Sequence, residues 1–142
     1  MTVFQSIDPA TGETVWEGPA ASAAEVQAAA DRARAAFPDW ADRPRQDRID
    51  AVKRYQAVLK ERAPQIAEAI SRETGKALWE TNTELQAMQG KVDISIRAYD
   101  ERTGERTAQT AFGSATLRHR PHGVAAGLGP VNFPGHLPTG HI

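Results

Sequence analysis

Asn132 is the residue best placed for chemistry, because its amide lies in the turn-rich loop Gly129–Gly135. The loop follows Val124–Leu128, a short apolar run without alternation that is typical of a strand buried on both faces of a parallel sheet. Ligands of α/β proteins bind at the carboxyl ends of such strands. From the residues alone, a turn-stabilising asparagine remains the favoured interpretation, and a catalytic amide is the alternative.

Other chemistries find less support in the residues. The chain has no cysteine, which excludes disulfides, thiolate metal sites and a thiol nucleophile. Gly127-Leu128-Gly129 begins the dinucleotide fingerprint G-x-G-x-x-G, but Asn132 stands at the third glycine. We expect no metal site, because the histidines have neither cysteine partners nor an i,i+4 pair. They are His119, His122, His136 and His141.

The composition is that of a globular chain of about one domain. The 142 residues include 17 Lys and Arg and 18 Asp and Glu, so the charges nearly balance. We therefore expect neither nucleic acid nor a membrane surface as a partner. No apolar run of membrane-spanning length occurs, and Met1–Gln5 is not followed by a signal-peptide core. These features predict a cytoplasmic protein.

Apolar residues recur every three or four positions in four stretches, which predicts four helices before the loop. They begin at the capping box Ser22–Glu25, after Pro44, near Pro64 and at Lys76. The first predicted helix ends at Pro38, and the apolar positions of the second extend to Leu59. The third ends at Gly75, and the fourth extends to about Arg102, with Gly104 as its C-cap.

Turn residues predict two β-hairpins, one around Asp8–Gly12 and one over 107–117 around Gly113-Ser114. A buried strand at Val124–Leu128 needs parallel neighbours, which the following residues cannot supply. The chain therefore reads as the first part of an α/β protein. An all-α domain with two hairpin appendages is the alternative.

The loop Gly129-Pro130-Val131-Asn132-Phe133-Pro134 resembles the proline-aromatic-Asn-Phe-Pro loop of the NAD(P)-dependent aldehyde dehydrogenase superfamily, with Val131 in place of the aromatic. The resemblance extends along the whole chain, through segments in the superfamily's N-terminal order. These segments are Asp8–Glu13, Ala35–Trp40 and Glu73–Lys76, followed by the long helix.

The resemblance implies an α/β fold made of a hairpin, four helices, an oligomerisation-type hairpin and the first strand of a Rossmann-like parallel sheet. Residues 1–104 would be the leading hairpin and the helical part of the cofactor-binding domain. Residues 105–121 would be the oligomerisation hairpin, which implies a homo-oligomer. Residues 122–142 would begin the dinucleotide-binding sheet and carry the oxyanion loop.

The resemblance also implies a reaction in which a cysteine thiolate attacks an aldehyde substrate, hydride passes to NAD, and water hydrolyses the thioester. Asn132 would donate its amide N–H to the oxyanion. Phe133 and Leu137 would line the aldehyde tunnel. The cofactor contacts would be Leu128, Gly129, Pro130, Val131 and Asn132. The cysteine belongs to family segments beyond Ile142, so we expect this chain alone to be inactive.

Within the superfamily, Lys91–Tyr99 and Gly135–Pro138 are most similar to the subfamily that oxidises N-succinylglutamate 5-semialdehyde in bacterial arginine catabolism. Two alternatives remain from the sequence. One is a stand-alone, non-catalytic assembly or binding module. The other is part of a related dehydrogenase that acts on a different semialdehyde.

Overall fold

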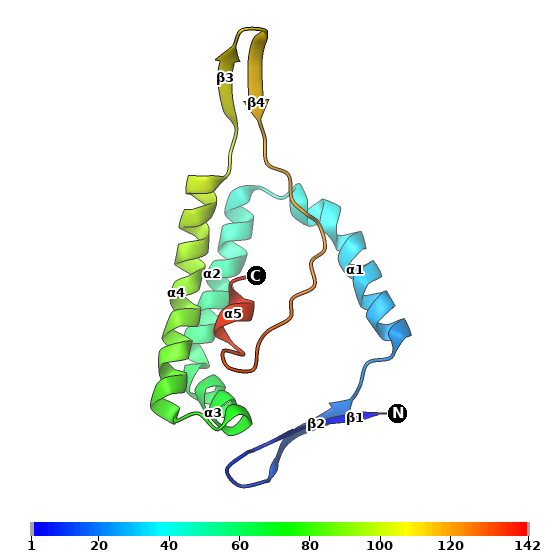
Figure 1. Ribbon diagram of the computed structural model, residues 1–142, viewed down its shortest axis with the longest axis vertical. Helices are drawn as coiled ribbons and strands as arrows, with labels where there is room; N and C mark the ends of the chain where they lie inside the picture. Colours follow the sequence, from blue (N-terminus) through cyan, green and yellow to red (C-terminus); the bar gives the residue numbers. More distant parts are fainter. Residues whose placement is uncertain (1, 142) are drawn as a thin grey trace.

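The computed structural model describes residues 2–141 as a helical body with a β-hairpin at each end (Figure 1). The fold is mixed α/β, as predicted, and all four predicted helices form. In chain order the elements are β1 (Val3–Ile7), β2 (Thr14–Pro19), α1 (Ala23–Ala41), α2 (Arg45–Glu61), α3 (Ala63–Thr74), α4 (Leu78–Arg102), β3 (Arg106–Thr110), β4 (Gly113–Leu117) and α5 (His136–Thr139).

Local sequence signals set the start of α1. The Ser22 hydroxyl accepts from the Glu25 backbone N–H at 3.3 Å, and the Glu25 carboxylate accepts from the Ser22 N–H at 2.7 Å, which is the predicted capping box. The predicted end at Pro38 is wrong, because α1 continues to Ala41. Proline removes one N–H donor, but its carbonyl still accepts from the Asp42 N–H at 3.0 Å, so the last turn closes.

Residues 75–77 join α3 to α4. Gly75 ends α3 with φ 72°, a left-handed conformation that favours glycine. The fourth helix begins at Leu78, two residues later than predicted, because Ala77 is extended. At the other end Thr103 caps α4, and the predicted cap Gly104 follows it with φ 102°.

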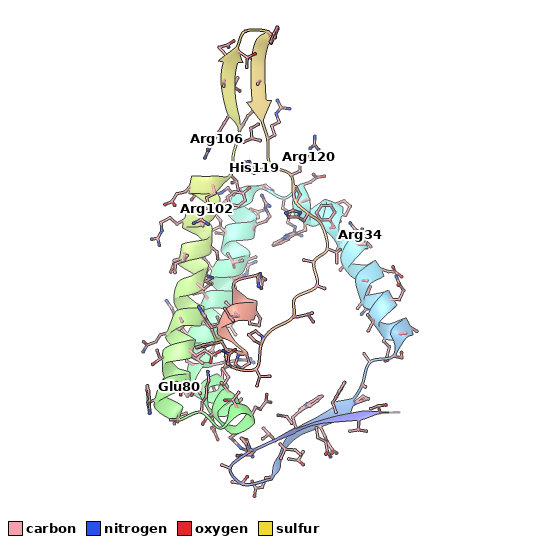
Figure 2. The ribbon with its side chains drawn as sticks, in the orientation of Figure 1. Arg34, Glu80, Arg102, Arg106, His119 and Arg120 are labelled. Carbon is pink, nitrogen blue, oxygen red and sulfur yellow. The ribbon has the colours of Figure 1, made fainter. Side chains whose placement is uncertain are left out.

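The two hairpins are antiparallel and separate from each other. The second turns at Ala111-Phe112, two residues before the predicted Gly113-Ser114, and Gly113 pairs with Thr110 as the first residue of β4. Every residue of both its strands is exposed. Basic side chains surround the point where this hairpin leaves α4 (Figure 2). They include Arg102, Arg106, His119 and Arg120.

The structure also corrects the predicted buried strand. Val124–Leu128 is not a strand, and residues 118–130 run as an irregular segment from β4 back past α1 toward α5 (Figure 1). A strand needs hydrogen-bonded neighbours, and each hairpin in residues 2–141 pairs only within itself. Leu128 is accordingly 96% exposed. The apolar run lacks the neighbouring strands that would bury it.

The core lies where α2, α3 and α4 meet. Helices α2 and α3 each pack on α4, which spans the body. Five buried side chains form the contiguous cluster, and Tyr55, Ala63 and Ile66 pack against it. The cluster consists of Leu59, Ala67, Ile70, Leu85 and Met88. The short helix α5, which follows the Asn132 loop, also packs on α4.

Candidate functional site

The predicted site residues lie on one exposed loop and on the helix that follows it. Asn132 occupies a turn just before α5 and is exposed. Leu128 and Val131 are 96% and 80% exposed, whereas Phe133 and Leu137 are 41% and 44% exposed. The loop is therefore open on its N-terminal side and partly covered on its C-terminal side, toward the helical body.

Asn132 shows no sign of the turn-stabilising role. In that role the side-chain oxygen accepts from a backbone N–H two residues on. Between residues 2 and 141, no hydrogen bond of the Asn132 side chain is found. The amide remains available to a ligand, and its role in catalysis stays a prediction.

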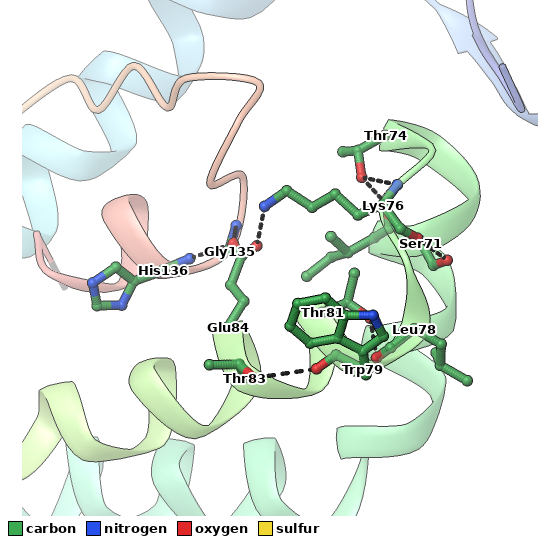
Figure 3. Close-up of polar contacts among 11 residues, drawn as sticks. Ser71, Thr74, Lys76, Leu78, Trp79, Thr81, Thr83, Glu84, Gly135 and His136 are labelled. Atoms are coloured by element: carbon green, nitrogen blue, oxygen red, sulfur yellow. Dashed lines mark hydrogen bonds and ion pairs between the residues drawn. The ribbon is translucent and has the colours of Figure 1, made fainter.

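A buried carboxylate anchors the chain three residues after Asn132 (Figure 3). Glu84, from α4, is 3% exposed. Its Oε1 accepts from the backbone N–H groups of Gly135 and His136, at 2.9 and 3.0 Å. These two groups open α5 and have no partner within the helix, so the carboxylate supplies the acceptor that they need.

Lys76 joins the same cluster from the α3–α4 junction. Its Nζ donates to Glu84 Oε2 at 3.1 Å, and the Lys76 side chain is 14% exposed. The same Nζ lies 4.3 Å from the centroid of the Phe133 ring, a cation–π contact. Lys76 thus touches both the anchor and the residue next to Asn132.

Glu84 is negatively charged at neutral pH. Burial raises the pKa of this carboxyl, but hydrogen bonds from the His136 N–H, the Lys76 ammonium and the Gly135 N–H together hold it below its ordinary value of 4.5. A charged carboxylate accepts stronger hydrogen bonds than a neutral one. The hydrogen bonds from Gly135, His136 and Lys76 to Glu84 are therefore strongest when the carboxylate is charged, as it is near neutral pH.

We expect this anchor to weaken in acid. Because the folded-state pKa lies below the unfolded value, ionised Glu84 stabilises the fold fully above pH 4.5 and loses that contribution as the pH falls through the folded-state pKa. Urea unfolding of the wild type and Glu84→Gln measures this. The gap in unfolding free energy should be constant from about pH 7 to 5 and narrow toward pH 3.

Glu101→Gln is the matched control, since Glu101 is exposed near the end of the same helix. The unfolding free energy of Glu101→Gln should differ little from that of the wild type at every pH. If the difference in unfolding free energy between the wild type and Glu84→Gln were as large at about pH 3 as at pH 7, the anchor would not depend on the charge of Glu84.

Close packing supplements the polar anchor. A Cβ on Gly135 would lie 2.6 Å from Met88 Sδ and 3.3 Å from Ile70 Cδ1, so a larger residue would require the Met88 side chain to move. Thr139, at the end of α5, is buried and donates from its hydroxyl to the Gly135 carbonyl at 2.7 Å. The Thr139 hydroxyl also lies 3.4 Å from the Tyr55 hydroxyl of α2, so the short helix is held to the body at both ends.

The sequence interpretation missed Glu84 altogether and used Lys76 only as part of a motif. The signal for Glu84 is its helical phase, because it precedes the buried Met88 by four residues and Leu85 by one. A carboxylate on the buried face of a helix needs a partner. Its partner at Gly135 lies 51 residues away, which periodicity cannot reveal.

Two further properties concern the part of the chain that the structure describes. In residues 2–141, no group of three or more His, Asp or Glu side chains is arranged to hold a metal ion. None of the helices in the same range is long and apolar enough to cross a membrane.

Comparison with known sequences assigns the whole chain to one family. The sequence model of the "Aldehyde dehydrogenase family" matches residues 1–142. An N-succinylglutamate 5-semialdehyde dehydrogenase of a Caulobacter species is 63% identical over 137 residues, which cover 96% of this chain and 28% of that protein. Relatives of the same name from Caulobacter vibrioides and Burkholderia mallei are 64% and 57% identical, over 98% and 99% of this chain. The chain spans about 29% of the length of each of these two.

Solved structures agree with this assignment. A methylmalonate-semialdehyde dehydrogenase from Oceanimonas doudoroffii superposes with a TM-score of 0.87 and 29% identity, over 97% of this chain and 28% of that one. A putative methylmalonate-semialdehyde dehydrogenase from Sinorhizobium meliloti, complexed with NAD, gives 0.87 and 28% identity with the same coverage. An NADP-dependent glyceraldehyde-3-phosphate dehydrogenase from Bacillus halodurans, complexed with NADP, gives 0.84 and 25% identity over 97% of this chain and 30% of that one.

Proposed function

This chain belongs to the aldehyde dehydrogenase family, and we propose that it is the N-terminal portion of an enzyme that oxidises N-succinyl-L-glutamate 5-semialdehyde to N-succinyl-L-glutamate in arginine catabolism. The observation that supports this proposal most is identity of 57–64%, over nearly the whole chain, to dehydrogenases of that name. We propose NAD as the electron acceptor, although relatives with NAD and with NADP share the fold.

Asn132 is proposed as the oxyanion donor. An amide N–H stabilises the negative charge that develops on the aldehyde oxygen, and it does so without titrating. Asn132 is exposed on a loop whose C-terminal side is fixed to α4 through Glu84. A donor on such a support is aligned before the reaction begins, so little reorganisation is needed at the moment of charge development.

The residues proposed to hold the cofactor are Leu128–Asn132, and their surroundings fit that role. Leu128 and Val131 are largely exposed, whereas Gly129 lies against the Pro138 ring, which a Cβ would approach to 2.6 Å. The loop is therefore open to a large planar group at Leu128 and Val131. When bound, the nicotinamide cofactor supplies the acceptor for hydride. We propose that Phe133 and Leu137 line the path of the aldehyde.

The division of the chain follows from this proposal. We propose that residues 1–104 form the helical part of the cofactor-binding domain and its leading hairpin, and that residues 122–142 carry the oxyanion loop. Residues 105–121 form the hairpin that we propose as part of a homo-oligomer interface. Its strands are wholly exposed, and such edges readily pair with another chain.

The proposal is tested by assaying the full-length protein with N-succinylglutamate semialdehyde and with succinate semialdehyde, using NAD and NADP in turn. We expect kcat/KM to be at least about 100-fold higher for the succinylated substrate, because a site built for its polar groups rejects an analogue that leaves them unpaired. Equal values would favour a different semialdehyde. Residues 1–142 alone, which contain no cysteine, should give no turnover.

A further inference from the structure

We propose that Glu84 is the positioning residue for the Asn132 loop, and that Lys76 completes the anchor by engaging the second carboxylate oxygen and the Phe133 ring. This role rests on the proposed function, since it gives Glu84 an effect on the reaction only through the Asn132 amide. Neither residue would touch the substrate. Both would act by fixing the loop that does.

Both oxygens of the carboxylate are engaged. The backbone N–H groups of Gly135 and His136 donate to Oε1, and the Lys76 ammonium donates to Oε2. The Glu84 side chain is 1% exposed, so water cannot easily replace it as the acceptor. Leaving those two backbone donors without an acceptor would cost desolvation free energy, and the loop would move to recover water.

The anchor lies very close to Asn132 along the chain. Phe133 is held over Lys76, and Gly135 is held by Glu84, with Pro134 between them. Proline fixes its own φ, which removes one soft dihedral angle between the two held residues. On the other side of Asn132, Leu128 and Val131 are largely exposed and offer no comparable support. The position of Asn132 is thus set from its C-terminal side.

The chemistry of the cluster requires a carboxylate at position 84. A glutamine there has one oxygen and one NH₂ group, and the NH₂ group would face either the Lys76 ammonium or the backbone N–H groups. Donor would oppose donor at one end of the side chain. The Lys76 ammonium would also lose its counter-charge in a largely buried position. Glu84→Gln therefore weakens the anchor while keeping the size of the side chain.

A double-mutant cycle in the full-length enzyme tests the role. The variants are Glu84→Gln, Asn132→Ala and the double variant, and the readout is the single-turnover rate of cofactor reduction, because product release often limits kcat. Glu84→Gln should lower this rate, measured at saturating cofactor, by about tenfold or more. In the Asn132→Ala background it should change the rate by less than about twofold, since the group it positions is gone.

Hydrogen exchange of the same proteins supplies a readout that does not depend on turnover. Glu84→Gln should speed exchange much more in the peptide that spans residues 129–137 than in the core peptides of α2. Glu101→Gln, on the exposed end of α4, should change neither quantity. If Glu84→Gln does not fold, Lys76→Met is the second variant, because it removes the partner of Oε2 and the Phe133 contact together.

Two results would overturn the role. One is a Glu84→Gln variant that lowers the single-turnover rate by the same factor with and without Asn132, because Glu84 would then act independently of the Asn132 amide. The other is unchanged exchange across residues 129–137. A failure of the proposed function is recognised separately, because it appears in the substrate comparison with the wild-type enzyme, where no variant is involved.

Discussion

Replacing Asn132 with alanine in the full-length enzyme should lower kcat by about 100-fold or more and change KM for the aldehyde little. The removal of one oxyanion donor in other enzymes costs about 10²–10³ in rate, because the lost hydrogen bond forms at full strength only when negative charge develops. A loss confined to kcat identifies an interaction made in the transition state. Steady-state assays with N-succinylglutamate semialdehyde and NAD measure both quantities.

Asn82 provides the matched control for this variant. Asn82 is also exposed, and its side chain donates to the Leu78 carbonyl within α4, far in sequence from the loop. Asn82→Ala should leave kcat within about twofold of the wild type, as surface substitutions usually do. An Asn132→Ala enzyme that kept the wild-type kcat would remove the oxyanion role from this residue.

Local signals account for what the sequence predicted well. The capping box at Ser22 and the left-handed Gly75 act within one turn of a helix, so their effects are decided by residues close in the chain. The periodicity that predicts α4 acts along the helix itself. These signals require no knowledge of which elements pack together, and they locate the frame that carries the site.

Non-local pairing accounts for what the sequence could not predict. Val124–Leu128 has the composition of a buried strand, yet a strand forms only when neighbours bind its backbone, and those neighbours do not occur in residues 2–141. Glu84 meets Gly135 across 51 residues. Helical phase places its carboxylate on the buried face of α4, but only the packing of α5 identifies the partner.

The largest effect on stability is expected for Leu85→Ala. Leu85 is 1% exposed and lies in the cluster where α2, α3 and α4 meet. Truncating a buried leucine removes its transfer free energy and leaves a cavity, at a cost of about 2–5 kcal/mol. Because whole domains are stable by only about 5–15 kcal/mol, the loss is a large share of the total. Urea unfolding of residues 1–142, followed by circular dichroism, measures it.

Leu128→Ala distinguishes burial from side-chain size, because Leu128 is 96% exposed in this structure. In residues 1–142 its truncation should change the unfolding free energy by less than about 0.5 kcal/mol. Equal losses at Leu85 and Leu128 would mean that the core lies elsewhere. Leu85 also adjoins Glu84 on α4, whereas Met88 touches the loop glycine Gly135. Loss of the core should therefore also loosen the Asn132 loop, which ties the stability of α4 to the alignment of the proposed oxyanion donor.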